Sequence, residues 1–247
     1  MLDLMVKEKV VKPLLINSIY QATEGEGIHL GNPQIFVRFQ GCAIGCINCD
    51  SRETWPFLEE TGSSVEAVVQ QIQSLSQTNR YPIKRVSITG GDPLHPRFHD
   101  GLLELIRQLK ALDFWINIEA SGVRIVDSVF ELVDFISFDF KTLSTNVQTR
   151  PEMIVRVAQN FGDKLQVKSV IESDEDFFQV VKVYQFVEKE LNSVYFAWCL
   201  TPAYNEREEF PLRRFKRVIE LNQQWGGIFR VVGQQHKWLY GPDSLRV

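Results

Sequence analysis

The sequence predicts an α/β fold on a parallel sheet, an open or incomplete barrel with about six core strands. Short apolar runs alternate with amphipathic helical patterns through most of the chain, which is typical of parallel strands joined by crossover helices. The predicted strands are rich in Val, Ile and Phe, as expected of strands buried on both faces. No Gly-, Ser- or Pro-rich linker is long enough to separate two domains, so we expect a single domain over residues 1–247.

Strand signals recur along the chain from Pro33 onward. Residues 33–40 alternate apolar and polar side chains before a cysteine-rich loop, and this alternation predicts a half-buried strand. Later strands are short apolar runs that end at glycine or polar turns. Residues 1–32 show no clear periodicity, and we expect an N-terminal extension there. The predicted strands are 33–40, 83–89, 114–119, 135–140, 164–171, 194–200 and 228–232.

Helical patterns fill the intervals between these strands. Ser63 and Ser64, followed by Glu66, predict the start of an amphipathic helix that runs to about Gln77. Asp174 is predicted to cap a longer helix near the C-terminal third. The predicted helices are 63–77, 98–111, 127–133, 151–160, 174–191 and 206–224.

Composition and charge exclude several classes of protein. With 44% apolar and 23% charged residues the chain is not largely disordered. Lys and Arg number 27 against 31 Asp and Glu, a net charge of −4, which argues against direct nucleic-acid binding. No run approaches the ~18–20 apolar residues of a membrane span, and residues 1–13 lack the apolar stretch of a signal peptide. We therefore expect a cytoplasmic protein with neither a membrane nor a nucleic acid as its partner.

Three of the four cysteines, Cys42, Cys46 and Cys49, fall within eight residues. In a reducing compartment such a group indicates a metal or redox site rather than disulfides. Three thiolates on one loop suit three corners of an iron–sulfur cluster, which leaves the fourth iron open to a ligand. A zinc site is the alternative, with Cys199 or a histidine as its fourth ligand. Inert thiols are the remaining possibility.

Polar residues follow three of the predicted strands where each strand ends. Because the carboxyl ends of parallel strands lie on one face of the sheet, where active sites are built, we expect these residues to converge there with the cysteine loop. They form three short motifs: Thr89-Gly90-Gly91-Asp92, Glu119-Ala120-Ser121-Gly122 and Asp139-Phe140-Lys141.

The Cys-x3-Cys-x2-Cys spacing after a strand, followed by a Gly-Gly-acid-Pro turn, resembles the radical S-adenosylmethionine (SAM) superfamily. This resemblance implies a partial β/α barrel and a [4Fe–4S] cluster whose fourth iron binds SAM. One-electron reduction would then cleave SAM to a 5′-deoxyadenosyl radical, so the cofactor carries the chemistry and the protein positions it.

Within that superfamily most of the chain resembles the 7-carboxy-7-deazaguanine synthases. Such enzymes are lyases that convert 6-carboxy-5,6,7,8-tetrahydropterin to 7-carboxy-7-deazaguanine with loss of ammonia, in the biosynthesis of queuosine, a modified tRNA nucleoside. The resemblance implies Mg²⁺, a homodimer, an electron donor such as flavodoxin or ferredoxin, and a tail over 233–247 that closes the active site. It rests on Glu24-Gly25-Glu26-Gly27, Ile35–Cys42, Cys49-Asp50-Ser51, Thr54-Trp55, Glu119–Gly122, Lys168–Asp176 and Gln235-His236-Lys237.

The resemblance also implies roles for individual residues, none of them catalytic because the radical comes from SAM. A guanidinium suits the substrate carboxylate and carboxylates suit the N–H groups of a pterin, while a hydroxyl is a hard oxygen ligand for Mg²⁺. The implied residues are Cys42, Cys46 and Cys49 for the cluster, Ser51 for Mg²⁺, Gly90, Gly91, Asp92, Ser121, Asp139 and Lys141 for SAM, and Glu24, Glu26, Arg38, Thr89, Glu119 and His236 for the substrate.

Two features leave alternatives open. Glu24 stands where the synthases usually have Gln, and an ionised Glu accepts hydrogen bonds but donates none. Asp139-Phe140-Lys141 is closer to the Asp-x-Lys of glycyl-radical activating enzymes, so an activase is the first alternative function. A non-catalytic binding module stabilised by zinc is the second.

Overall fold

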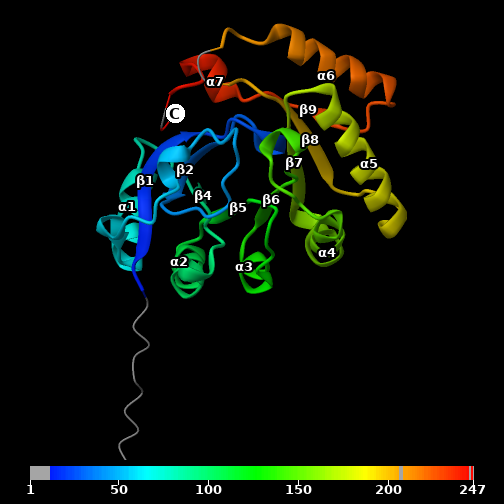
Figure 1. Cartoon of the computed structure of the whole chain (residues 1–247). Helices are drawn as coiled ribbons and strands as arrows, with labels where there is room; N and C mark the ends of the chain where they lie inside the picture. The colour runs from blue at the N-terminus through cyan, green and yellow to red at the C-terminus, as the bar shows by residue number, and fades with distance from the viewer. Residues whose placement is uncertain (1–11, 206–207, 245, 247) are drawn as a thin grey trace, which may run out of the picture.

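A curved sheet, flanked by helices, forms the framework of the protein (Figure 1). The computed structural model describes residues 12–205, 208–244 and 246. Within these residues nine strands lie in the order β3-β1-β2-β4-β5-β6-β7-β8-β9. The strands are β1 (Leu14–Thr23), β2 (Pro33–Phe39), β3 (Gly62–Ser63), β4 (Arg85–Gly90), β5 (Trp115–Ala120), β6 (Phe135–Asp139), β7 (Leu165–Ile171), β8 (Ala197–Pro202) and β9 (Arg230–Val231).

From β2 to β9 every neighbouring pair of strands is parallel, whereas β1 pairs antiparallel with both β2 and β3. Helices α1 to α5 lie around the outer side of the sheet (Figure 1), as right-handed crossovers require. The sequence prediction of a partial parallel barrel is therefore confirmed. The helices are α1 (Val65–Ser76), α2 (His99–Ala111), α3 (Asp127–Leu132), α4 (Pro151–Phe161), α5 (Asp174–Leu191), α6 (Leu212–Gln224) and α7 (Gln235–Tyr240).

The core lies between the outer face of the sheet and these helices. Ile88 and Ile118 on the sheet and Leu105 and Ile106 on α2 are fully buried. Burial of each such side chain contributes about 1.5–3 kcal/mol to the stability of the fold. Ser64 caps α1 by accepting a 3.2 Å hydrogen bond from the backbone N–H of Ala67. Helix positions were thus predictable from the apolar period and the cap residue.

A chain of polar side chains fills the inner side of the sheet. Asn117 donates to Ser87 Oγ (2.9 Å) and accepts from Ser137 Oγ (3.2 Å). Gln166 donates to the same Ser137 hydroxyl (2.6 Å), and its Oε1 accepts from the backbone N–H of Ile28 (2.9 Å). This network joins β4, β5, β6 and β7 to the segment after β1, so the N-terminal segment is fixed inside the barrel beneath the strand ends.

The N-terminal region differs from the prediction. Residues 14–23 form β1, although no regular element was expected within 1–32. The pairing register of β1 with β2 shifts between Ile16 and Ser18, and such a bulge interrupts the alternation that marks a strand in sequence. Residues 1–11 of the predicted extension lie outside the described residues.

Two helix starts also differ. Ser173 rather than Asp174 caps α5, in a capping box with Asp176. Helix α6 begins at Leu212 and not at 206, which lies outside the described residues. Pro211 explains the late start, because a proline disfavours helical backbone in the residue before it.

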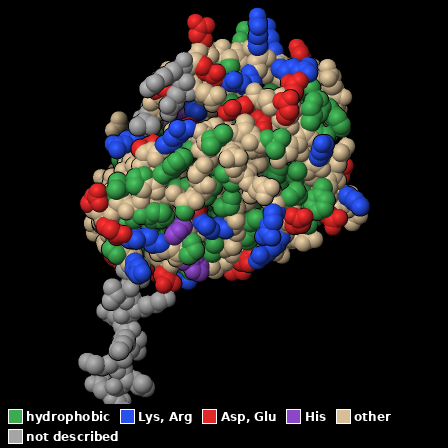
Figure 2. All heavy atoms as spheres, in the orientation of Figure 1, with side chains coloured by type: hydrophobic (Ala, Val, Ile, Leu, Met, Phe, Trp, Pro, Cys, Tyr) green, Lys and Arg blue, Asp and Glu red, His purple; other side chains and the backbone are tan. Residues whose placement is uncertain are grey.

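The C-terminal end contains one helix that was not expected, α7, inside the predicted tail over 233–247. Residues 245 and 247 lie outside the described part. Among the described residues no helix is long and apolar enough to cross a membrane. On the face shown in Figure 2 acidic and basic side chains are interspersed.

Candidate active site

One cavity of about 340 Å³ opens at the carboxyl ends of the parallel strands, a size within the ~300–1,000 Å³ range of small-molecule sites. It brings together every residue implied by the resemblance except Asp92. Its lining includes Cys42, Cys46, Cys49, Ser51, Gly90, Gly91, Ser121, Asp139, Lys141, Glu24, Glu26, Arg38, Thr89, Glu119 and His236.

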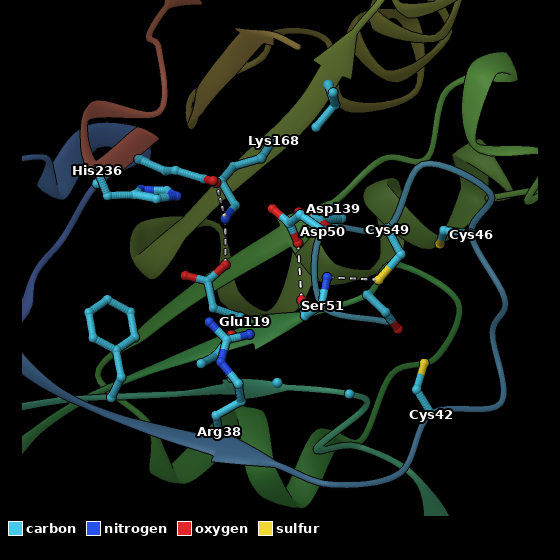
Figure 3. A pocket seen from close by; sticks show the side chains of 18 of the residues that line it. Arg38, Cys42, Cys46, Cys49, Asp50, Ser51, Glu119, Asp139, Lys168 and His236 are labelled. Atoms are coloured by element: carbon cyan, nitrogen blue, oxygen red, sulfur yellow. Dashed lines mark hydrogen bonds and ion pairs between the residues drawn. The ribbon is translucent and has the colours of Figure 1, made fainter. Parts of the chain in front are cut away.

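The cysteine loop forms one wall of this cavity (Figure 3). All three thiols are free and partly exposed. Cys49 Sγ accepts hydrogen bonds from the backbone N–H of Ser51 and from the indole Nε1 of Trp55, both at 3.4 Å. Donors aimed at sulfur are typical of iron–sulfur ligands. These residues therefore fit a cluster held by Cys42, Cys46 and Cys49.

A zinc centre built on these cysteines fits less well. Among the described residues no three His, Cys, Asp or Glu side chains gather closely enough to hold one ion. A cubane spreads its ligands, since each thiolate binds a different iron, whereas zinc needs four ligands around one ion. Cys199, the proposed fourth zinc ligand, is fully buried in β8, and its thiol donates to Gln166 Oε1 at 3.9 Å.

The Gly90-Gly91 turn is fastened to the start of the cysteine loop. Gly90 has a φ of +110°, and a Cβ there would meet the backbone of Phe39. The N–H groups of Gly91 and Asp92 donate to the carbonyls of Phe39 and Gly41, both at 3.0 Å. Two glycines are required because the two backbone segments approach this closely.

Asp92 lies outside the cavity lining. Its side chain is fully buried and forms an ion pair with Arg124. The prediction that Asp92 contacts SAM is not tested by this geometry. Arg124 contacts Oδ2 of this carboxylate, whereas Oδ1 is buried without a hydrogen-bond partner.

The cavity wall after β5 and β6 carries unsatisfied and charged groups. Ser121 Oγ is buried and has no hydrogen-bond partner, so a bound polar ligand would satisfy it. Lys141 Nζ lies 2.7 Å from Asp139 Oδ2. Burial lowers the pKa of Lys141, but Asp139 outweighs this effect and raises it, so Lys141 stays charged.

A buried lysine, Lys168, connects two carboxylates on the inner side of the sheet (Figure 3). Its Nζ lies 3.1 Å from Glu26 Oε2 and also contacts Glu119 Oε2. Burial acts to raise the pKa of Glu26, but Lys168, His236 and a hydrogen bond from Gln234 together lower it to about 2. Glu26 is therefore ionised throughout the physiological range.

Glu24 belongs with Glu26 and Glu119 to one carboxylate cluster, but its environment is different. It is 7% exposed and accepts hydrogen bonds from Gln34 Nε2 (2.7 Å) and from the N–H of Glu26 (3.1 Å). Burial and the neighbouring Glu119 raise the pKa of Glu24 to about 7. Two carboxylates two residues apart thus have opposite pKa shifts, which is a feature of functional sites.

Arg38 faces the carboxylate cluster from β2 (Figure 3). It is aligned with Thr89 of β4 in the sheet register, and its Nη2 donates to the Tyr20 hydroxyl at 3.1 Å. The ring of Tyr20 stacks on Phe36 with centroids 5.4 Å apart. This strand pair therefore presents a guanidinium beside an aromatic wall.

The C-terminal segment contributes His236 and Lys237 to the cavity lining. Gln234 Nε2 donates to Glu26 Oε1 (2.7 Å), and Lys237 Nζ lies 3.3 Å from Asp50 Oδ2 in the cysteine loop. Burial lowers the pKa of His236, so its imidazole is neutral at physiological pH. The ring lies so close to Gly25 that a Cβ there would overlap it.

Several lining residues were missed by the sequence reasoning. Strand alternation could have revealed Lys168, since the inner positions of β7 follow a period of two, but its carboxylate partners lie on distant segments. Thr201 Oγ1, buried without a partner, ends β8 and is subject to the same strand-end argument as Thr89. The missed residues include Tyr20, Phe36, Trp55, Phe140, Lys168, Thr201 and Lys237.

Comparisons with known proteins agree with this geometry. A family model described as a 4Fe-4S single cluster domain matches residues 23–134, which include the three clustered cysteines. The 7-carboxy-7-deazaguanine synthase of Buchnera aphidicola is 31% identical over 125 residues, 45% of this chain and 55% of the relative. The chain spans about half the length of the first curated relatives that it matches.

Two further matches extend over more of the molecule. The crystal structure of QueE from Escherichia coli superimposes with a TM-score of 0.68 at 22% identity, over 91% of this chain and 95% of that one, which shows a shared fold. The 7-carboxy-7-deazaguanine synthase of Synechocystis sp. is 31% identical over 162 residues, 66% of this chain and 67% of the relative. The activase and zinc-module alternatives are not favoured by these matches, and the chain belongs to the 7-carboxy-7-deazaguanine synthase family.

Proposed function

We propose that this protein converts 6-carboxy-5,6,7,8-tetrahydropterin to 7-carboxy-7-deazaguanine and ammonia. The observation that carries the proposal is the single cavity in which a three-cysteine loop faces Arg38 and a Lys168-linked carboxylate cluster. The atoms of the substrate equal those of the product plus one ammonia. The overall conversion is therefore redox neutral and needs no external oxidant.

The cofactors implied are a [4Fe–4S] cluster, SAM and Mg²⁺. When bound and reduced by one electron, the cluster and SAM would together supply the radical that abstracts a hydrogen atom from the substrate. Cys42, Cys46 and Cys49 would hold the cluster, and the donors to Cys49 Sγ would stabilise its thiolate charge.

The residues proposed for SAM lie next to the cysteine loop. Ser121 Oγ, which has no protein partner, would bond a polar group of SAM. Lys141 and Asp139 form a charged pair at the same wall, which suits the amino, carboxylate and ribose groups of SAM. Gly90 and Gly91 would offer backbone carbonyls at a place where no side chain fits.

The substrate residues form the opposite end of the cavity. Arg38 would bind the substrate carboxylate with its planar guanidinium. Glu26 and Glu119, both held by Lys168, would accept hydrogen bonds from the N–H groups of the pterin. Thr89 and His236 would add polar contacts at the sides, where the neutral imidazole offers one N–H donor and one acceptor nitrogen.

Mg²⁺ would bind at Ser51, whose hydroxyl donates to Asp50 Oδ1 at 3.0 Å. Both side chains offer hard oxygen atoms of the kind that Mg²⁺ prefers, with substrate and water completing an octahedron. On the resemblance we further propose a cytoplasmic homodimer that receives electrons from flavodoxin or ferredoxin.

The test is anaerobic reconstitution with iron and sulfide, followed by dithionite, SAM, Mg²⁺ and the tetrahydropterin. We expect product of the mass of 7-carboxy-7-deazaguanine from the wild type and from Cys199→Ala, and none from Cys46→Ala. Cys199→Ala is the matched control, because it removes a thiol that is buried in β8 away from the loop. SAM cleavage without this product in the wild type would overturn the substrate assignment.

A further inference from the structure

We propose that Glu24 is a specificity-determining residue that binds the pterin as a neutral carboxylic acid, so that substrate binding takes up a proton. The inference rests on the proposed function for the identity of the ligand. It concerns the one carboxylate of the cluster that has no cationic partner.

The three carboxylates share a single ammonium group. Lys168 Nζ contacts both Glu26 and Glu119. The hydrogen-bond donors to Glu24 are neutral, namely the Gln34 amide and the backbone N–H of Glu26. Removing an unpaired carboxylate from water is costly, and a buried carboxyl group without a cation retains its proton.

The other charged group that faces Glu24 is on β4. The guanidinium of Arg85 stacks on Trp115, with its centre 3.6 Å from the ring. Its Nε and Nη2 atoms are buried without a hydrogen-bond partner, and Glu24 has its hydrogen bonds with Gln34 and the Glu26 backbone rather than with this guanidinium. Burial, Glu119 and Glu26 raise the pKa of Glu24, and Lys168 opposes them. The net effect is a pKa of about 7.

A protonated Glu24 changes the chemistry that the cavity offers. Ionised Glu26 and Glu119 only accept hydrogen bonds, whereas a carboxylic acid supplies one donor as well as an acceptor. The pyrimidinone edge of a pterin carries both N–H donors and C=O or ring-nitrogen acceptors. An ionised Glu24 would face those acceptors with a third negative charge, so the ligand favours the protonated form.

Because the ligand favours protonated Glu24, binding above the pKa of Glu24 must be accompanied by the uptake of a proton, which can be measured. The probe is 6-carboxypterin, an air-stable compound with the same carboxyl group and pyrimidinone edge. Its binding is measured by calorimetry in two buffers of different ionisation enthalpy. Above pH about 7 we expect the wild type to take up close to one proton per ligand, and Kd to rise about tenfold per pH unit. Glu24→Gln, which keeps the shape and is always neutral, should take up none and should bind with a Kd independent of pH over this range.

Equal proton uptake by wild type and Glu24→Gln, or binding to the wild type without uptake, would overturn the inference. Glu190→Gln, which removes an exposed carboxylate of α5, should behave as the wild type. A failure of the proposed function gives a different result, in which 6-carboxypterin binds to none of the proteins at any pH.

In that case the free protein still decides whether Glu24 holds a proton. Infrared difference spectra between wild type and Glu24→Gln should show the C=O band of a buried carboxylic acid at pH about 6, and the band should vanish as the pH rises through about 7. A spectrum with only carboxylate bands at the lower pH would contradict the inference whatever the ligand.

Discussion

The side-chain amide of Gln234 donates a 2.7 Å hydrogen bond to Glu26 Oε1, across 208 residues of sequence. The backbone N–H of Gln235 donates to the carbonyl of Gly25 at 2.9 Å in the same place. The start of α7 and the residue before it are thus attached directly to the segment after β1. Glu26 is consequently oriented from two sides, by Gln234 and by Lys168.

Gln234→Leu should raise the KM for the tetrahydropterin about tenfold while the cluster absorbance stays unchanged. A hydrogen bond to a charged group contributes about 1.5–3 kcal/mol, and about 1.4 kcal/mol corresponds to a factor of ten. The measurement is initial rate against substrate concentration. Gln223→Leu, at an exposed position of α6, is the control. An unchanged KM in Gln234→Leu would show that Glu26 does not depend on this amide.

Arg38→Ala should raise the KM strongly and leave the iron content intact. The guanidinium lies beside the carboxylate cluster and is anchored by Tyr20, so its loss removes the cation assigned to the substrate carboxylate. Arg38→Lys should restore little, because an ammonium group cannot form the planar double contact. Loss of the cluster in Arg38→Ala would mean that Arg38 supports the cysteine loop instead.

Gly122→Ala should destabilise the fold more than Gly226→Ala does. The two glycines have similar φ angles, +80° and +84°, so the backbone strain of an alanine is comparable, on the order of 1–3 kcal/mol. A Cβ at Gly122 would overlap the carbonyl of Asp139, whereas the space around Gly226 is open. Urea unfolding of both variants isolates the Asp139 contact, and equal midpoints would contradict the close approach seen here.

Glu24 makes stability depend on pH in a defined direction. Its pKa rises from an ordinary 4.5 to about 7 on folding, so between these values the folded state holds a proton that the unfolded state has lost. Stability must therefore fall as the pH increases through this window. The full shift corresponds to about 3 kcal/mol.

Glu24→Gln removes the loss of stability that deprotonation of Glu24 causes. The melting temperature of the variant should therefore exceed that of the wild type above pH about 7. Below pH about 4.5 both states of the wild type are protonated at Glu24, and the advantage of the variant should disappear there. Thermal melts across the range provide the test. A constant difference between the two proteins at every pH would exclude Glu24 as the titrating group.

Elements with a clear period and cap were predictable from the sequence. The apolar faces of α1 and α2 and the strand that leads to Cys42 appear where the patterns placed them. Strand β1 was missed because the bulge near Ile16 interrupts its alternation. Helix α7 was missed because six residues carry too little periodicity, and its contacts to Gly25 and Glu26 are long-range.

The residues of the candidate site likewise fall into those that the sequence predicts and those that it does not. Strand ends predicted Thr89, Glu119 and Asp139, since parallel topology alone brings them to one face. The lysine between Glu26 and Glu119 was not predicted, because Lys168 becomes an ion-pair partner only when a segment 142 residues away folds into the barrel. Likewise the unlike environments of Glu24 and Glu26 depend on Gln34 and Gln234, and no local pattern encodes them.

The most direct test of the central claim is to quantify 7-carboxy-7-deazaguanine and ammonia in one anaerobic reaction started from the tetrahydropterin. We expect equal amounts of both products, dependent on SAM and absent in Cys46→Ala. Cleavage of SAM with neither product formed would contradict the claim, and would assign the cavity to a different substrate.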